Sequence, residues 1–145
     1  MLSVRERILQ GLLALLSPVA TAHGATLARA PTVPTDRARL PALLLFPESE
    51  TVRRLNDRAE RELTLRLVAL ALGSANTAPD IRVDALMSAA HAALMADSTL
   101  GGLALSVEET DTEWSHDDAD GEAVALSSRY RLTYRTFFHD LTQKG

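Results

Sequence analysis

The chain has 145 residues, no cysteine and a formal net charge of −4 at pH 7. This length predicts one domain, residues 1–145, with a core large enough to be stable without cross-links. The lack of cysteine excludes disulfides and thiolate chemistry, and the mild negative charge is unlike the basic surface of a nucleic-acid-binding protein. No apolar run approaches the ~20 residues of a spanning helix, so we expect no membrane partner.

The N-terminal segment predicts a helix that begins near Ser3. Ser3 and Glu6 have the three-residue spacing of a capping box. An apolar helical face follows, and Pro18 predicts the end of the helix. The face consists of Ile8, Leu9, Leu12, Leu15 and Leu16. We therefore expect a helix that packs on the core.

The same segment has some features of a secretory signal peptide. Arg5 and Arg7 precede the apolar run, and small residues at positions 20–22 fit a cleavage site. Glu6 and Gln10 interrupt that pattern. We therefore interpret the segment as a helix of the mature protein and expect a cytoplasmic origin.

Prolines divide the next part of the chain. Residues 25–29 predict a short strand, and the proline-containing residues 30–39 predict a loop or an extended arm. Residues 41–47 are apolar between Pro41 and Pro47, which predicts a buried strand.

The segment 48–66 carries five arginines and five acids. Its alternation predicts a strand, a turn at Asn56 and Asp57, and a second strand that includes residues 62–72. Residues 68–72 are apolar on both faces, which predicts a central place in the sheet. The alternative is a helix with one apolar face, made of Val52, Leu55, Ala59 and Leu63.

A second helix is predicted from about residue 79 to residue 96. Thr77 and Pro79 have the spacing of a helix start with proline in the first turn. The buried stripe would consist of Val83, Leu86, Met87, Ala90 and Leu94. Gly101 and Gly102 then predict a tight turn before the next strand.

The clearest pattern lies near the C-terminal end. Residues 122–138 alternate between apolar side chains and basic or polar ones, which predicts a strand with one apolar and one basic face. Residues 102–114 predict its partner strand, and the polar residues 115–121 predict the hairpin loop.

Burial of every apolar side chain on one face gives the register that we expect for this hairpin. The expected pairs are Val107 with Tyr130, Leu105 with Leu132, Leu103 with Tyr134, Glu108 with Arg129, and Ser106 with Arg131. In this register Arg131 and Arg135 have no acidic residue directly opposite.

These elements together predict an α+β fold. It would consist of a mainly antiparallel sheet, two helices packed on it and a long C-terminal β-hairpin.

No residue pattern predicts a catalytic, metal or cofactor site, so we do not expect an enzyme. The serines have no nucleophile-elbow context, and no glycine loop has the spacing that binds phosphate. The acidic residues 116–121 suggest a calcium loop, but alignment on Gly121 puts Ser127 where the loop needs Glu. We interpret His91 as a packing or helix-surface residue and not as a ligand.

Several short motifs carry a resemblance to a known family. They are DSTLGGLA at 97–104, Glu113 with Trp114, and YRLTYRT at 130–136 followed by Asp140. With these motifs and the order of its elements, the chain resembles the tail terminator and tail-completion proteins of long-tailed phages (the lambda minor tail protein U type). The arm at 30–39 has no counterpart in that family.

The resemblance implies a structural virion protein of a siphovirus or prophage, located at the head–tail junction and assembled in the host cytoplasm. Six copies would form a ring that caps the tail tube, stops tube polymerisation and presents a surface for head–tail joining. The implied partners are other copies of the chain, the tail tube protein and a head-completion or connector protein. DNA would pass through the ring without specific binding.

A ring requires two different complementary patches on each subunit. The residues that we expect at the subunit or tube interface are the charged side chains of two segments. They are Arg129, Arg131 and Arg135 on the last long strand, and Arg53, Arg54, Arg58, Glu60, Arg61 and Glu62 in the mixed-charge stretch.

Two alternatives to a tail terminator stay open at this point. One is another head–tail connector or neck protein. The other is a small intracellular enzyme or ligand-binding protein, which a deep apolar pocket with converging polar groups would favour.

Overall fold

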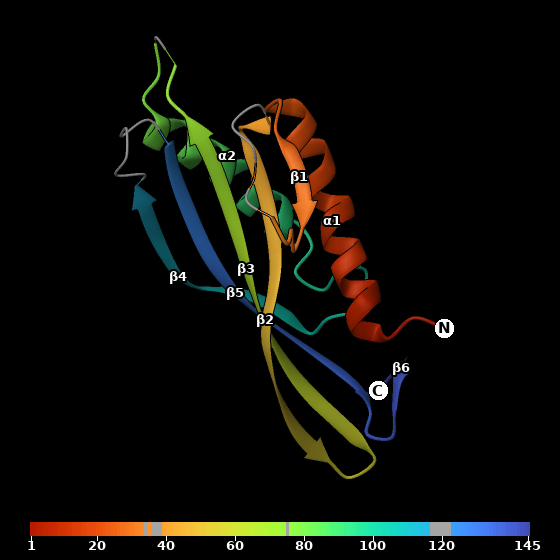
Figure 1. The fold of residues 1–145 in the computed structure, drawn as a ribbon. Helices are drawn as coiled ribbons and strands as arrows, with labels where there is room; N and C mark the ends of the chain where they lie inside the picture. Colours follow the sequence, from red (N-terminus) through yellow and green to blue (C-terminus); the bar gives the residue numbers. More distant parts are fainter. Residues whose placement is uncertain (34, 36–38, 75, 117–122) are drawn as a thin grey trace.

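The computed structural model describes residues 1–33, 35, 39–74, 76–116 and 123–145. A six-stranded sheet has the strand order β1-β2-β3-β5-β4, with β6 paired to β5, and the two helices pack on one of its faces (Figure 1). The elements are α1 Val4–Ala22, β1 Thr26–Arg29, β2 Ala42–Leu55, β3 Arg58–Leu72, α2 Pro79–Met95, β4 Ser106–His116, β5 Ala123–Phe137 and β6 Asp140–Lys144. β1 runs parallel to β2 and the other pairs are antiparallel, so the expected α+β fold is confirmed.

Helix α1 starts as predicted, because the Ser3 hydroxyl oxygen accepts a hydrogen bond from the Glu6 amide at 3.0 Å. The predicted end at Pro18 is wrong, since the helix continues to Ala22. Pro18 lies on the exposed side of the last turns, whereas Leu16 and Ala20 on the opposite side are buried. Burial of this face therefore outweighs the helical hydrogen bond that proline cannot make.

The segment 48–66 forms two strands, so the helical alternative is wrong. β2 and β3 are joined by a tight turn at Asn56 and Asp57, as predicted. Asn56 has φ +59°, a left-handed conformation that asparagine tolerates better than most residues. β3 has neighbours on both sides, which confirms the predicted central place of residues 68–72.

The strand predicted at 41–47 and the one predicted before the turn at Asn56 are a single strand, because β2 continues through Pro47 to Leu55. β1 pairs with β2 only as far as Leu45, so among the described residues no strand lies on the outer side of Pro47, and the proline removes no ladder hydrogen bond there. The register then shifts between Pro47 and Ser49, which makes Glu48 the extra residue of a β-bulge.

Helix α2 agrees with the prediction in its bounds and in its buried stripe. The following turn also forms as expected, with φ +68° at Gly101 and +93° at Gly102. The Asp97 carboxylate accepts hydrogen bonds from the amides of Thr99 and Gly101, at 3.1 and 2.8 Å. The hydrogen bond from the Thr99 hydroxyl is the main cause that lowers the pKa of Asp97 below its ordinary value, and the two amide hydrogen bonds lower it further.

The C-terminal hairpin forms from β4 and β5, but its predicted register is wrong. Val107 pairs with Leu132 instead of Tyr130, a shift of two residues along β5. A shift of two keeps every side chain on its face, so alternation alone cannot distinguish these registers. β4 begins at Ser106, so the predicted pairing of Leu103 within the strand is also wrong. Of the predicted loop, residues 117–121 lie outside the described part of the chain, as does residue 122 of the predicted strand.

The core lies between the sheet and the two helices. Its largest fully buried side chains include Tyr130 and Tyr134 of β5, on the apolar face that the alternation predicts. A smaller cluster on the other face contains Ala42, Leu44 and Val68. Arm residues Pro31, Val33, Thr35 and Arg39 border a hollow of about 260 Å³ beside this cluster, together with Thr26, Ala28 and Leu44.

β6 was not predicted from the sequence. It pairs with the end of β5 and brings the C-terminus back beside the β2–β3 turn (Figure 1). Neither described helix has the length and apolar character that crossing a bilayer would require.

Candidate interaction surfaces

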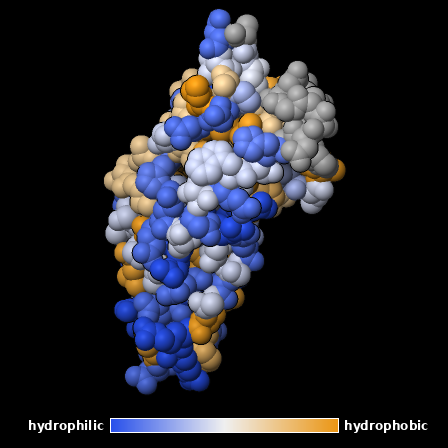
Figure 2. Space-filling model, turned by 90° about the vertical axis from the view of Figure 1, so that its left-hand side faces the viewer, coloured by the Kyte–Doolittle hydropathy of each residue, from blue (hydrophilic) through white to orange (hydrophobic). Residues whose placement is uncertain are grey.

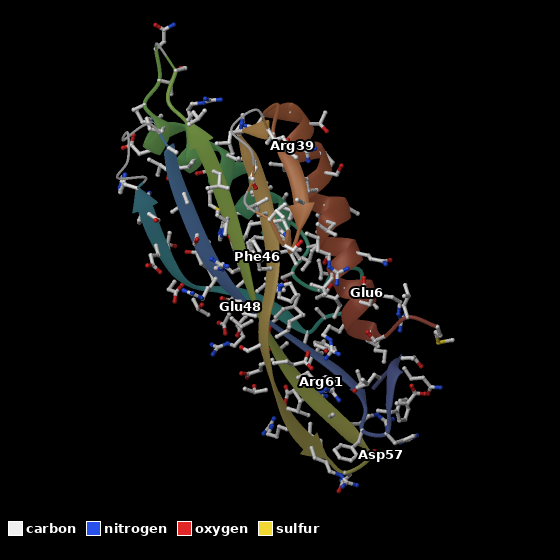
Figure 3. The ribbon with its side chains drawn as sticks, in the orientation of Figure 1. Glu6, Arg39, Phe46, Glu48, Asp57 and Arg61 are labelled. Atoms are coloured by element: carbon white, nitrogen blue, oxygen red, sulfur yellow. The ribbon has the colours of Figure 1, made fainter. Side chains whose placement is uncertain are left out.

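The predicted arginine face lies on the side of the sheet away from the helices, which we call the open face. There Arg129 lies between two acids: its Nε donates to Glu48 Oε1 at 2.9 Å and its Nη1 to Asp111 Oδ1 at 3.4 Å. Arg131 donates through Nε to Glu108 Oε1 at 2.8 Å. Figure 3 shows Glu48 about halfway along the long strands of the sheet.

These pairs correct the expectation that Glu108 faces Arg129 and that Arg131 has no acid opposite. The observed register puts Glu108 opposite Arg131 and Asp111 opposite Arg129. The hydrogen bond to Glu108 raises the pKa of Arg131, and the bond to Glu48 is the main cause of the raised pKa of Arg129. Most of the arginine face is thus neutralised within the subunit.

Arg135 differs from the other two arginines of β5. On its β3 side, which the predicted hairpin register did not address, it lies opposite Glu60, but Glu60 is bound by Arg53. The Arg53 hydrogen bond holds the pKa of Glu60 below its ordinary value. Among the described residues, Arg135 itself makes no ion pair and its side chain is exposed. It is the arginine of this face that a partner could reach most directly.

Arg61 is placed inside the subunit, although the sequence predicts it as an interface residue. Its Nη1 donates to Glu50 Oε2 and its Nε to Thr136 Oγ1, both at 3.1 Å, and only 8% of the residue is exposed. Glu50 also accepts from Arg5 at 2.7 Å and from the Tyr134 hydroxyl. Burial, together with Glu50, raises the pKa of Tyr134. Sequence analysis missed Glu50 because the bulge at Glu48 changes which face its side chain occupies.

The end of the β2–β3 hairpin combines cations with aromatic rings. The Arg54 guanidinium lies 4.0 Å from the centre of the Phe138 ring, and that of Arg58 lies 3.9 Å from the Phe137 ring. Val52, Phe138 and Leu141 are 50%, 42% and 41% exposed. We call the surface formed by Val52, Arg53, Arg54, Arg58, Phe138 and Leu141 the hairpin end. Arg53 and Glu62, two of the predicted interface residues, are exposed, and their interface role stays a prediction.

A second surface, which sequence analysis did not predict, lies between helix α2 and the edge strand β4. It is a groove of about 360 Å³, which we call the α2–β4 groove. Its lining residues are Asp84, Met87, Ser88, His91, Glu109, Thr112, Trp114, Leu126 and Ser128. Trp114 is 51% exposed, and a second hollow, of about 370 Å³, joins it to Asp80, Ile81 and Asp84. The one feature of the sequence that could have indicated this groove is Trp114, the single tryptophan, which lies among the acids of β4.

His91 has the packing role that the sequence predicts. Its Nδ1 lies 2.9 Å from the Tyr130 hydroxyl and 3.3 Å from Glu109 Oε2. Burial, and to a lesser degree the Glu109 charge, raises the pKa of Tyr130. The described residues contain no group of three or more acids or histidines arranged to hold a metal ion. Of the acidic stretch 116–121, only His116 is described.

The side of the molecule that carries β4 is mainly hydrophilic. Figure 2 shows blue residues over the middle of this side and down to the hairpin end, with small orange patches between them. On β4 itself, Glu108, Asp111 and Glu113 are exposed. A partner that docks on this side therefore meets charged side chains around limited apolar contacts.

No protein-family model and no curated protein matches the sequence. Among solved structures, a similar chain comes from the virion of a native gene transfer agent particle. It is 12% identical, the match covers 90% of each chain, and the TM-score is 0.47. This is a likeness to a component of a virion, and a likeness of this degree assigns no role to the present chain.

Proposed function

We propose that this chain is a structural subunit of a ring that caps a phage tail tube. The ring ends tube polymerisation and provides the surface on which the head is joined. Six copies make the ring, it lies at the head–tail junction of the virion, and no catalytic step is involved. The motif resemblance in the C-terminal half is the starting point of this proposal.

The observation that carries the proposal is the presence of two unlike surfaces at opposite ends of the subunit. The hairpin end carries arginines beside apolar side chains, and the α2–β4 groove carries acids beside apolar side chains. Unlike patches make heterologous contacts, which close into a ring when the rotation between subunits permits.

The charge distribution also suits a channel for DNA. Phosphate binding depends on lysine and arginine side chains that are free to neutralise it. Arg129 and Arg131 of the open face are held by acids of the same subunit, and the chain has a net charge of −4. DNA would therefore slide past such a ring without adhering to it.

The experiment that tests this function is the removal of the chain from the assembling particle. Particles without it should have tails of irregular and excessive length that do not join heads. Cryo-EM of complete particles should show one ring of six copies at the head-proximal end of the tail. A single copy, a non-cyclic arrangement or normal tails in the absence of the chain would overturn the proposal. A ring located in the neck above a separate tail cap would favour the alternative of a head–tail connector.

The open face is the candidate surface for the tail tube in this proposal. The double variant Arg131→Glu with Arg135→Glu should remain folded and still form the ring, but cap tubes poorly. Thr133→Ala, between the two on the same face, is the matched control and should leave capping unchanged. Normal tail length in the folded double variant would exclude this face as the tube contact.

A further inference from the structure

We propose that the α2–β4 groove of one subunit receives the hairpin end of a second copy of this chain. This interface rests on the proposed ring and specifies how neighbouring subunits meet within it.

The groove has an apolar floor and an acidic margin. Met87 and Leu126 are buried at its base, and the indole of Trp114 covers part of it from β4. On α2, Asp80 and Asp84 are exposed at the margin, and within the described residues neither makes an ion pair. The groove therefore fits a partner that presents an apolar side chain flanked by a cation.

The hairpin end has the complementary chemistry. Arg54 donates from Nε to the backbone oxygen of Asn56 at 2.8 Å and stacks on Phe138, and among the described residues it has no carboxylate partner. Val52 lies two residues before it on the same face of the strand and is 50% exposed. An arginine held against an aromatic ring is already ordered, so less freedom is lost when it pairs with a carboxylate.

The two surfaces lie at different ends of the subunit, so each of them can contact a different neighbour. The β2–β3 turn lies at one end of the molecule, and the start of α2 lies near the other (Figure 1). Each subunit would therefore use its hairpin end on one neighbour and its groove on the other. Such a head-to-tail contact propagates around a ring.

Strand edges support the same partner. Within the described residues, no strand pairs with the outer edge of β4, nor with β2 beyond Leu45. Unpaired edges are sites where another chain adds a strand, unless charge opposes it. The acids on β4 would oppose another β4 and accept a strand that carries arginine, which favours the hairpin of a second copy over a symmetric β4–β4 contact.

Cross-linking tests this interface directly, because the chain contains no cysteine of its own. Val52→Cys places a thiol at the hairpin end, and Trp114→Cys places one in the groove, both at half-exposed positions. The double variant, assembled into particles and treated with a short bismaleimide, should give a ladder of cross-linked multimers that ends at the ring. Each single variant should stay uncross-linked, and a mixture of the two single variants should give only dimers.

The outcomes separate this inference from the proposed ring. If cryo-EM shows the ring but the double variant gives no ladder, the inference is overturned and the ring stands. If either single variant gives dimers, the contact is symmetric and the inference is also overturned. If no cyclic arrangement exists in the particles, the proposed function fails together with it.

Charge exchange gives a second measurement that does not depend on thiols. Arg54→Asp should reduce the yield of rings several-fold, and Arg54→Asp combined with Asp84→Arg should restore it. Arg39→Asp is the matched control, because Arg39 is also an exposed arginine without an ion pair among the described residues but lies in the arm, which belongs to neither surface. Equal loss for both single variants, or no rescue in the exchanged pair, would contradict the assignment.

Discussion

The two halves of the β2–β3 hairpin are stabilised in different ways, although the same two strands run through both. The half next to the helices is apolar on both sides, with Leu43 and Leu67 fully buried in the main core and Leu44 and Val68 in the small cluster. The half beyond the bulge at Glu48 is stabilised by ion pairs and by arginines stacked on aromatic rings.

This difference shows what each half contributes. Apolar burial of about 25 cal/mol per Å² stabilises the first half strongly and is not screened by salt. Exposed ion pairs in the second half contribute little each and are screened by salt. The hairpin end should therefore open more readily than the helix-covered half, as surfaces that adapt to partners commonly do.

The largest expected effect lies in the core of β5. Leu132→Ala removes a side chain with 0% exposure and should lower the free energy of unfolding by about 2–5 kcal/mol. Thr133→Ala, the next residue on the other face, should have a far smaller effect. Denaturant titration of both variants measures the difference, and equal losses would contradict the assignment of the faces.

A somewhat smaller effect is expected in the buried network at the junction of the two halves. Glu50→Gln leaves the Arg61 guanidinium, with a side chain 10% exposed, without its carboxylate, and should cost about 2–4 kcal/mol. Glu48→Gln is the matched control on the open face, where Glu48 is 28% exposed, and should cost less than about 1 kcal/mol. If Glu48→Gln lowers the free energy of unfolding as much as Glu50→Gln in the same titration, burial of Arg61 does not depend on the Glu50 carboxylate.

The hairpin end allows a direct comparison of two stacked arginines. Phe137→Leu removes the ring under Arg58 and should cost about 0.5–1 kcal/mol, with faster hydrogen exchange at the turn around Asn56. Phe46→Leu removes the ring under Arg66, 4.7 Å away, in the half that apolar packing stabilises. That variant should leave exchange at the turn unchanged. Faster exchange at the turn in both variants would mean that the two halves open together.

The smallest effect concerns an ion pair between α1 and β1. The hydrogen bond from Arg29 to Glu6, at 2.5 Å, holds the pKa of Glu6 below its ordinary value of 4.5. The folded state then binds fewer protons than the unfolded state at acidic pH, so this contribution is complete above pH 4.5 and is lost as the pH falls through the folded pKa.

Glu6→Gln should therefore cost less than about 1 kcal/mol at neutral pH. The difference from the unmodified chain should shrink in acid, as thermal denaturation at several pH values would show. A difference that does not change with pH would mean that the pair contributes through packing and not through charge.

Most of the fold could be predicted from hydrophobic alternation and from turn residues. The strand at the C-terminal end, the turn at Asn56 and the buried stripe of α2 all depend on local patterns that the sequence displays. The predicted helix end at Pro18 was wrong because burial of Ala20 outweighs the low helix propensity of proline. The hairpin register was wrong because a shift of two residues preserves the alternation on which it depended.

The candidate surfaces were less predictable than the fold. The arginines of β5 were assigned to the correct face, yet their partners Glu48 and Glu108 could not be known without the order of strands and the bulges. Arg61 is predicted at the interface together with the other charges of its stretch, although it shares the alternation of Leu63 and Leu65, which places its side chain on the helix-covered face. The α2–β4 groove depends on how far the helix layer extends over the sheet, which no local pattern encodes. The interface role of these residues stays a prediction.

The bulge at Glu48 also determines where β2 tolerates a change of length. Before it, odd-numbered residues such as Leu45 face the helices, and after it, even-numbered residues such as Glu50 do so. Because Pro47 and Ser49 pair with consecutive residues of β3, deletion of Glu48 would leave a regular ladder with every remaining side chain on its own face. Deletion of Thr51 would instead transfer Val52 and the residues after it to the opposite face. Related chains of different length should therefore carry their single-residue gap in this strand at position 48.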